Sequence, residues 1–497
     1  MSTPAAAPED VQRLREALWA AGFNAERVAE AMRAEGAGFT PNPAHVPALL
    51  RLLPPTGALS TLIQLFLANV AVPVDAAASA LAPLPLARAE AIGLLTVAGG
   101  EATAKVRLAP AEDLVLACDL TPDIARVAPD VVVGVSASSW SLVHLTVRRP
   151  VATAVDIGAG SGIQALLAAR HATRVTATDI NPRALAFARF SAALNNVAPI
   201  EFLEGDLTAP VAGRHFDLVV SNPPFVVSPD HDYLYRDSGH AADGVSRQVV
   251  QDAGALLSEG GYAHVLVSWV HGAGADWSQP LRDWVGGLGC DAWLLHFGSQ
   301  DALDYATAWN QPLQGDPERH AAAVGRWIDY FARENIEAIG YGAVILRRRS
   351  GVTWTRAQSL GRPPDRAAND QVRDLFAAMD YLASQTGPDR LLDERFAFDQ
   401  PHRLHQVLRL REGAFHVDEA MLHLESGLAL RAAVDAYSAH LLTCMDGRKT
   451  LEEAVADSAR VLAPDADRAE LRRRTVDLVE RMVELGILRP STMPGRG

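Results

Sequence analysis

The chain has 497 residues, of which 49% are hydrophobic, and a formal net charge of −14. This length exceeds one ordinary domain, and about two to four are expected. No apolar run reaches the roughly 20 residues that a membrane-spanning helix needs. The opening residues, MSTPAAAPEDVQRL, carry acids and no basic stretch before an apolar core, which argues against a secretory signal. We therefore expect a cytoplasmic protein with several domains.

The cysteine positions and the charge further restrict the kind of protein that this chain can be. Cys118, Cys290 and Cys444 are far apart and form no C-x-x-C pair, which fits a reducing compartment and argues against a disulfide framework or a cysteine zinc site. Residues 151–350 hold 14 basic and 22 acidic residues. Because proteins that grip long nucleic acids normally present a basic field, this acidity counts against an extended nucleic-acid footprint. Scarce lysine and abundant alanine are typical of a GC-rich bacterial genome.

Before residue 149 the pattern predicts helices followed by a hairpin. The run GLLTVAGGEATAKVRL predicts a β-hairpin with Gly99 and Gly100 at its turn. Helices and a hairpin in this order resemble a winged helix; a plain helical cap on the next domain is the alternative. Amphipathic helices are expected near 9–21, 24–35 and 43–53, three more apolar helices between 59 and 94, and a helix near 138–148.

From residue 151 the sequence VATAVDIGAGSGIQALLAAR predicts a strand, a tight turn and a helix. Asp156 lies near the strand's end, and Gly158, Gly160 and Gly162 follow at alternate positions. The missing Cβ atoms let the chain bend and let a ligand approach the backbone. An acid two residues before the first glycine would repel a pyrophosphate and suits a ligand with an ammonium group. The spacing therefore argues against the dinucleotide fingerprint and the oxidoreductases that use it.

A second acid, Asp179, ends the next expected strand. A helix follows, with Asn181 as its cap and Pro182 in its first turn. Asp179 lies 23 residues after Asp156, the position from which a carboxylate can accept both hydroxyls of a ribose.

A third motif, Asn222-Pro223-Pro224-Phe225, follows a buried strand expected at 216–221. Neither proline has an N–H to donate, so the pair cannot continue a sheet. The Asn222 side-chain oxygen and the Pro223 carbonyl can accept the two N–H groups of a planar amide or base amine, and Phe225 offers it a flat face.

Strands and helices alternate over residues 149–350, as in parallel βαβ units, so we expect an α/β domain. The expected strands lie near 152–156, 174–178, 200–204, 216–221, 262–268, 291–297 and 338–347. The expected helices lie near 162–171, 182–195, 243–257, 277–287 and 317–335.

Residues 351–372 are polar with two adjacent prolines, which predicts a linker. The region 373–497 is expected to form strands in LHQVLRLREGAFHVDEAMLHL and then a small helical module that resembles a winged helix. Its expected features are helices near 431–444, 450–461 and 467–485, a turn at Asp446-Gly447, a capping box of Thr450 and Glu453, a helix stop at Gly486 and a short strand at Ile487-Leu488.

The motifs together resemble those of class I S-adenosylmethionine-dependent methyltransferases, over about 200 residues. The resemblance implies a Rossmann-like sheet of seven strands, the last one antiparallel, and S-adenosylmethionine as the cofactor. We expect this domain at 149–350, flanked by winged-helix-like domains at 1–148 and 373–497. The residues implied to bind the cofactor are Asp156, Gly158, Gly160, Gly162, Asp179, Ile180, Asp206, Leu207 and Asn222.

The Asn-Pro-Pro-Phe ending resembles the catalytic motif of N-methyltransferases that act on a planar nitrogen. These include the glutamine methyltransferases of release factors and the guanine or adenine N-methyltransferases of RNA and DNA. The resemblance implies catalytic roles for Asn222, Pro223, Pro224 and Phe225. The polar segment that follows is the expected substrate lid, in which Phe225 is joined by Tyr233, Tyr235 and Arg236. His231 and His240 in this segment lack metal-ligand spacing, and we expect no metal.

The sequence thus predicts an N-methyltransferase whose acceptor is a protein glutamine amide or a nucleobase amine, presented by a protein or RNA partner. Two alternatives stay open: a methyltransferase of a small-molecule amine, and a catalytically inactive methyltransferase fold that serves as a binding scaffold. The intact Asp156, Asp179 and Asn-Pro-Pro-Phe motifs argue against the inactive scaffold.

Overall fold

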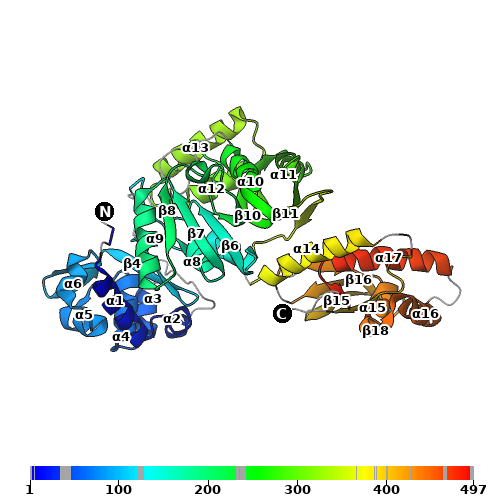
Figure 1. Cartoon of the computed structure of the whole chain (residues 1–497), viewed down its shortest axis with the longest axis horizontal. Coiled ribbons are helices and arrows are strands. Elements are labelled where there is room, and N and C mark those ends of the chain that lie inside the picture. The colour runs from blue at the N-terminus through cyan, green and yellow to red at the C-terminus, as the bar shows by residue number, and fades with distance from the viewer. Residues whose placement is uncertain are drawn as a thin grey trace. The chain divides into compact units, whose positions relative to one another are not determined.

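The computed structural model describes residues 3–4, 6–33, 46–120, 128–230, 234, 242–364, 367–385, 387, 389–398, 401–425, 427–428, 430–462 and 467–492. The chain divides into two compact units (Figure 1). The first comprises residues 1–142 and 149–362, and the second comprises residues 143–148 and 363–497.

The first unit is built on an eight-stranded sheet with the order β13-β11-β12-β10-β9-β6-β7-β8. All neighbouring pairs are parallel except the two that β12 makes with β10 and β11. The antiparallel seventh strand is therefore as expected. The strands are β6 (Val151–Ile157), β7 (Ala172–Asp179), β8 (Ile200–Glu204), β9 (Phe216–Ser221), β10 (Leu257–His271), β11 (Cys290–Asp301), β12 (Ala338–Arg348) and β13 (Thr355–Ser359).

The eighth strand, β13, lies in the stretch predicted as a linker. Its sequence, TRAQS, is polar, and its side chains are exposed or half-buried, as is typical of an edge strand. Its pairing to β11, in which Thr355 lies opposite Ala292, makes it a strand. A polar edge strand and a loop look alike in sequence, because neither carries an apolar face to detect.

Helices pack against this sheet and cover a core of buried aliphatic side chains. Helix α8 packs on β6 and β7, α10 packs on β9, β10 and β12, and α11 packs on β10 and β11. The helices are α8 (Ile163–Ala168), α9 (Pro182–Leu194), α10 (Gly244–Leu256), α11 (Gln279–Val285), α12 (Ala302–Trp309) and α13 (Pro317–Arg333), with short 3₁₀ turns at Ala209–Val211 and Gln311–Leu313. Helix α12 was not predicted from the sequence.

The N-terminal region consists of short helices and two small antiparallel sheets. The expected hairpin forms, with Ala98 opposite Glu101 and Gly99 and Gly100 in the turn. The helices are α1 (Pro8–Ala21), α2 (Ala25–Met32), α3 (Val46–Leu52), α4 (Ala58–Leu62), the π-helix η2 (Ile63–Leu67), α5 (Val74–Leu81), α6 (Leu86–Ala91) and α7 (Ala137–Leu145). The strands are β1 (Val72–Pro73), β2 (Leu95–Ala98), β3 (Glu101–Ala104), β4 (Val106–Ala111) and β5 (Leu114–Asp119).

This region shares its hydrophobic core with the large sheet's layer of helices. Phe187, Phe190 and Leu194 of α9 belong to the same buried cluster as Leu14 and Leu18 of α1. Strand β5 is bound to α9 by side chains, because Ser191 accepts from the Ala117 amide at 3.0 Å. The two regions on either side of the boundary expected at residues 148 and 149 therefore share a core, and residues 1–142 fall in the same unit as residues 149–362.

Among its described residues, the second unit combines two three-stranded sheets with four helices. Expected strands and helices form, but residues 431–433 are a strand paired to β16 instead of the start of a helix. Asp446 and Gly447, expected as a turn, are the first residues of a strand over 446–450 that pairs with β14. The elements are α14 (Asn369–Ser384), β14 (Arg395–Phe398), β15 (His402–Arg411), β16 (Ala414–Leu424), β17 (Arg431–Ala433), α15 (Ala436–Thr443), β18 (Asp446–Thr450), α16 (Leu451–Leu462), α17 (Arg468–Glu484) and β19 (Leu488–Pro490).

Local signals in this unit act as the sequence predicts. The Thr450 amide donates to Glu453 at 2.8 Å and the Glu453 amide donates to Thr450 at 3.3 Å, which is the expected capping box. Gly486 ends α17 with a positive φ of 64°.

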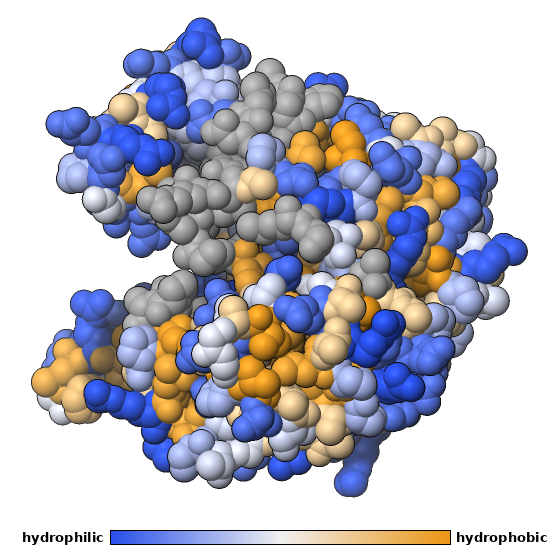
Figure 2. Space-filling model, turned by 90° about the vertical axis from the view of Figure 1, so that its left-hand side faces the viewer, coloured by the Kyte–Doolittle hydropathy of each residue, from blue (hydrophilic) through white to orange (hydrophobic). Residues whose placement is uncertain are grey.

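The surface of the chain carries both hydrophilic and apolar side chains. Figure 2 shows several apolar areas among hydrophilic side chains on the face that it views. In the described part of the chain, no helix combines the length and the apolarity needed to cross a membrane.

We expect Gly342→Ala to destabilise the first unit by at least about 2 kcal/mol, because a buried clash with backbone cannot relax cheaply. A Cβ at Gly342 would lie 1.9 Å from the Leu295 carbonyl oxygen, inside the β11–β12 ladder. Gly298→Ala is the matched control on β11, where a Cβ would meet no atom within 4 Å. Denaturant unfolding of both variants checks this. Equal losses of stability would contradict the packing argument.

Candidate active site

A cavity of about 420 Å³ opens at the carboxyl ends of β6, β7 and β9. Parallel pairing aligns these ends, since Ile157 lies opposite both Thr178 and Ser221. The residues that follow the three strands therefore face one another across the cavity. Among the expected site residues in the described part of the chain, Gly162 does not line the cavity. The others do, and they are Asp156, Gly158, Gly160, Asp179, Ile180, Asp206, Leu207, Asn222, Pro223, Pro224 and Phe225.

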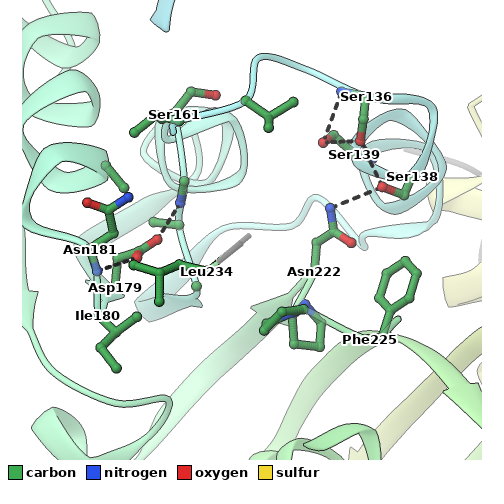
Figure 3. A pocket seen from close by; sticks show the side chains of 18 of the residues that line it. Ser136, Ser138, Ser139, Ser161, Asp179, Ile180, Asn181, Asn222, Phe225 and Leu234 are labelled. Atoms are coloured by element: carbon green, nitrogen blue, oxygen red, sulfur yellow. Dashed lines mark hydrogen bonds between the residues drawn. The ribbon is translucent and has the colours of Figure 1, made fainter. Parts of the chain in front are cut away.

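Figure 3 shows two groups of side chains in this cavity. Asp179, Ile180 and Asn181 lie together on one side. Asn222 and Phe225 lie on the other, where the Asn222 amide points toward Ser138. In this view Leu234 lies between the groups.

The glycine turn after β6 is held against the end of β7. The amides of Gly158 and Ala159 both donate to the Thr178 carbonyl at 2.9 Å. Gly158 and Gly160 have φ values of 73° and 54°, which favour glycine. A Cβ at either position would meet no atom within 4 Å. The turn thus presents open backbone to the cavity.

Gly162 has a different role from the one expected. It does not line the cavity but precedes α8, with a φ of 92°. A Cβ there would lie 2.9 Å from the Ala188 Cβ, so the missing side chain lets α8 approach α9. The glycine spacing alone could not separate this packing role from contact with a ligand.

Asp179 connects the turn to the next helix. One carboxylate oxygen accepts from the Gly160 amide and the other from the Asn181 amide, each at 2.8 Å. Burial raises the pKa of Asp179, while these amides lower it. The Ile180 amide is a third donor to this carboxylate, so of its roughly four lone-pair sites at least one is left for a ligand. The neighbouring Ile180 is half exposed.

Asp156 is almost fully buried, with 1% of its surface exposed. It accepts a hydrogen bond from the Ala165 amide of α8 at 2.9 Å. Desolvation, with a smaller contribution from the nearby Asp179 charge, raises its pKa to about 7, although the Ala165 hydrogen bond acts to lower it. The cavity floor therefore holds two carboxyl groups whose charged forms are disfavoured, which suits a ligand that carries positive charge.

Asp206 and Leu207 lie in the turn after β8. The Thr178 hydroxyl donates to the Leu207 carbonyl at 3.0 Å, and the Gly205 amide donates to the Asp179 carbonyl at 3.1 Å. The turn is therefore fixed to the end of β7, and both residues line the cavity.

Asn222 follows β9 directly, and its side chain has a defined orientation. The Nδ2 atom donates to the Ser138 hydroxyl at 3.3 Å, which leaves Oδ1 as the free acceptor. Phe225 packs against Tyr341 with ring centroids 5.4 Å apart. A hydrogen-bond acceptor and an aromatic face thus lie side by side in the Asn-Pro-Pro-Phe motif.

The expected lid residues Tyr233, Tyr235 and Arg236 lie outside the described residues, as do His231 and His240. Leu234 is described, lines the cavity and donates its amide to the Pro129 carbonyl at 3.1 Å. No group of three histidine, cysteine, aspartate or glutamate residues suited to a metal ion occurs among the residues that the structure describes.

The sequence interpretation missed one wall of the cavity. Residues between 131 and 139 line it, as do Gln164 and Asn181 from the helices, and Trp309 from α12. Ser136 and Ser139 form a reciprocal cap at the start of α7, with amide-to-hydroxyl distances of 3.2 and 3.3 Å. The spacing S-x-x-S before an apolar helix was the available signal for this cap.

Comparison with known proteins agrees with this geometry. Residues 136–272 match the family model described as "Methyltransferase small domain". This region is a methyltransferase domain. Two further models, each described as a domain of unknown function, match residues 20–105 and 373–490. The predicted resemblance to methyltransferases is thereby confirmed.

Curated relatives are similar to part of the chain. A release factor glutamine methyltransferase of Deinococcus radiodurans is 38% identical over 119 residues, which cover 22% of this chain and 42% of the relative. A putative protein N5-glutamine methyltransferase of Methanocaldococcus jannaschii is 30% identical over 24% of this chain and 62% of the relative. A ribosomal RNA small subunit methyltransferase C of Alcanivorax borkumensis is 32% identical over 22% of this chain and 29% of the relative. The chain thus spans less than two thirds of each.

The buried acid of the methyltransferase domain leads to a prediction about stability. Because the pKa of Asp156 is raised in the folded state, the folded chain holds a proton there that the unfolded chain releases. Wild-type stability should therefore fall as pH rises toward about 7. The Asp156→Asn variant has no such charge, and between pH 5 and pH 8 the wild type should lose about 3 kcal/mol relative to it.

Denaturant unfolding of both proteins at the two pH values measures this difference, and groups common to both cancel. The Asp156→Asn variant keeps an oxygen that can accept from Ala165, so a lost hydrogen bond does not confuse the result. A difference that does not change with pH would show that Asp156 is ionised at an ordinary pKa.

Proposed function

We propose that this chain is an S-adenosylmethionine-dependent N-methyltransferase that methylates a planar nitrogen, and that its acceptor is a glutamine amide of a protein. The observation that carries the proposal is the fixed Asn222 amide. It presents Oδ1 beside Phe225, in the cavity that also holds the glycine turn, the buried Asp156 and the half-buried Asp179. The methyltransferase relatives support the same reading.

The cavity suits the cofactor. Gly158 and Gly160 leave open space where a side chain would otherwise stand, so a ligand can lie against the turn. Asp156 would compensate the positive charge of the cofactor's amino-acid end. Asp179 would accept the ribose hydroxyls with its remaining lone pairs, and Asp206 would accept from the adenine amine. When bound, the cofactor supplies an electrophilic methyl group on a neutral thioether leaving group.

The residues of the chain then act on the acceptor. An amide nitrogen has a delocalised lone pair and is a weak nucleophile. If Asn222 Oδ1 and the Pro223 carbonyl accept its two N–H groups, the nitrogen is drawn toward tetrahedral geometry and its lone pair is aimed at the methyl group. Phe225 would stack on the planar group. The S–CH3 bond breaks as the N–CH3 bond forms, and the methylated nitrogen then loses one of its N–H protons to solvent. No general base is required before the transfer, and none is assigned.

The nature of the acceptor follows from charge and from the relatives. The formal charge of −14 disfavours a long phosphate backbone, because each neutralised phosphate needs a cation on the protein. The first relatives described above are named as glutamine methyltransferases. A nucleobase amine is the second candidate, favoured by the match to a ribosomal RNA methyltransferase. Methylation of a small-molecule amine and a non-catalytic scaffold are not favoured.

We further propose that the part of the N-terminal region before Val131 and the C-terminal region recognise the macromolecular acceptor and take no part in the chemical step. In the described part of the chain, the residues that line the cavity lie between Val131 and Trp309. In the second unit, the hairpin of β15 and β16 carries exposed apolar side chains on paired positions, which can contact a protein surface. They include Leu408 opposite Val417 and Leu410 opposite Phe415.

The acceptor can be identified directly. Purified enzyme and methyl-labelled cofactor are incubated with a cell lysate, with protease and RNase treatments in parallel, and the labelled product is hydrolysed. We expect protease-sensitive label that yields N-methylglutamine. A methylated guanine or adenine would favour the second candidate, whereas a methyl ester or a C-methyl product would overturn the mechanism.

The role of Asn222 can be tested in the same assay. Asn222→Ala should lower the rate of methyl transfer by about 10²–10³-fold, the typical cost of one lost group that stabilises a transition state. Cofactor affinity, measured by calorimetry, should stay within a few-fold. Asn195→Ala is a matched control, since Asn195 bonds to β5 away from the cavity. An Asn222→Ala enzyme that keeps more than about a tenth of the rate would exclude the assigned role.

A further inference from the structure

The orientation of the Asn222 amide depends on helix α7. An amide side chain can present either its oxygen or its nitrogen to a ligand. Here Nδ2 donates to the Ser138 hydroxyl at 3.3 Å, and the Ser138 oxygen lies 2.7 Å from the Ser136 hydroxyl (Figure 3). Ser138 thus takes an N–H of Asn222 and leaves Oδ1 for the acceptor.

The helix turn that carries Ser138 is held by hydrogen bonds on its neighbours Ser136 and Ser139. The cap formed by Ser136 and Ser139 sets the first turn of α7 around it. The Ser139 carbonyl accepts from Gln164 Nε2 at 3.0 Å, and Gln164 is a buried residue of α8, the helix that follows the glycine turn. The start of α7 is therefore tied to the cofactor side of the cavity.

The same helix supports the aromatic side of the acceptor site. Tyr341 packs on Phe225, and a side-chain hydrogen bond joins Tyr341 to Ser141. The Ser141 hydroxyl also donates to the Ala137 carbonyl at 3.0 Å, which fixes this side chain on α7. Phe297 packs on the other part of Tyr341, with centroids 5.3 Å apart.

We propose that α7 is a positioning helix for the acceptor, in which Ser138 orients the Asn222 amide and Ser141 holds Phe225 in place through Tyr341. This inference rests on the proposed function. If the amide rotated, its N–H groups would face the N–H groups of the acceptor, a donor–donor contact that opposes binding in the reactive geometry. Ser138 and Ser141 touch neither acceptor nor cofactor in this scheme and act only through their partners.

The test compares three substitutions at Ser138 with the acceptor identified by product hydrolysis. Ser138→Ala removes the hydroxyl, Ser138→Cys keeps nearly the same volume with a weak acceptor, and Ser138→Thr keeps the hydroxyl. We expect the first two to lower kcat about three- to tenfold, the scale of one lost hydrogen bond, and the threonine variant to stay near the wild type. Ser60→Ala, at a buried helical serine of the N-terminal region, is the control for stability alone.

Two readouts separate positioning from general loss of structure. Cofactor affinity and Tm should match the wild type in the cysteine variant, and Ser138→Ala should have no further effect in an Asn222→Ala background. Ser141→Ala should raise the acceptor KM more than it lowers kcat. Unchanged kcat in both Ser138→Ala and Ser138→Cys, with methyl transfer by the wild type, would overturn this inference alone. Absence of any transfer by the wild type would overturn the proposed function and this inference with it.

Discussion

The carboxylate of Asp179 is the contact on which the cavity depends. It accepts the amides of Gly160 and Asn181 and so joins the glycine turn after β6 to the start of α9. The Thr178 carbonyl beside it accepts two more amides of the same turn. Both segments begin where β6 and β7 end, so their amides cannot pair with a neighbouring strand. Without this acid the turn would have buried N–H groups with no partner, which is costly.

The same arrangement leaves an electrostatic imbalance at the cavity floor. Asp156 is buried and Asp179 is half-buried, and desolvation raises the pKa of both carboxyl groups because it disfavours their charged forms. Backbone amides partly stabilise the charged carboxylates: the Ala165 amide donates to Asp156, and the Gly160 and Asn181 amides donate to Asp179. A cationic ligand would further stabilise the charged carboxylates, whereas a phosphate would be repelled by them. This charge pattern distinguishes the site from a dinucleotide pocket with a similar glycine turn.

The site also extends beyond the region that matches the methyltransferase family model. Val131, Val132 and Gly134 line the cavity, although the match begins at residue 136. Asn181 and Arg183 of the helix after β7 bond to the Asp130 carbonyl at 2.8 and 3.0 Å. Arg183 also pairs with the buried Asp119 at the end of β5, at 2.6 Å. The N-terminal region therefore helps to build the pocket through the same helix that shares its core.

Local patterns in the sequence determined much of this protein. The strand–turn–helix around Asp156, the capped helix after Asp179 and the Asn-Pro-Pro-Phe motif all fold as predicted, because glycine, proline and capping residues act within a few positions of themselves. Alternating apolar segments predicted where along the chain seven of the sheet's eight strands lie, but not their order in the sheet. Tertiary structure decided what depends on a distant partner. Strands β13 and β17 exist only through pairing, Gly162 serves helix packing, and Ser138 meets Asn222 across 84 residues of chain. Such contacts carry no local signal, since a serine at the start of a helix looks the same whether or not an amide from another strand reaches it.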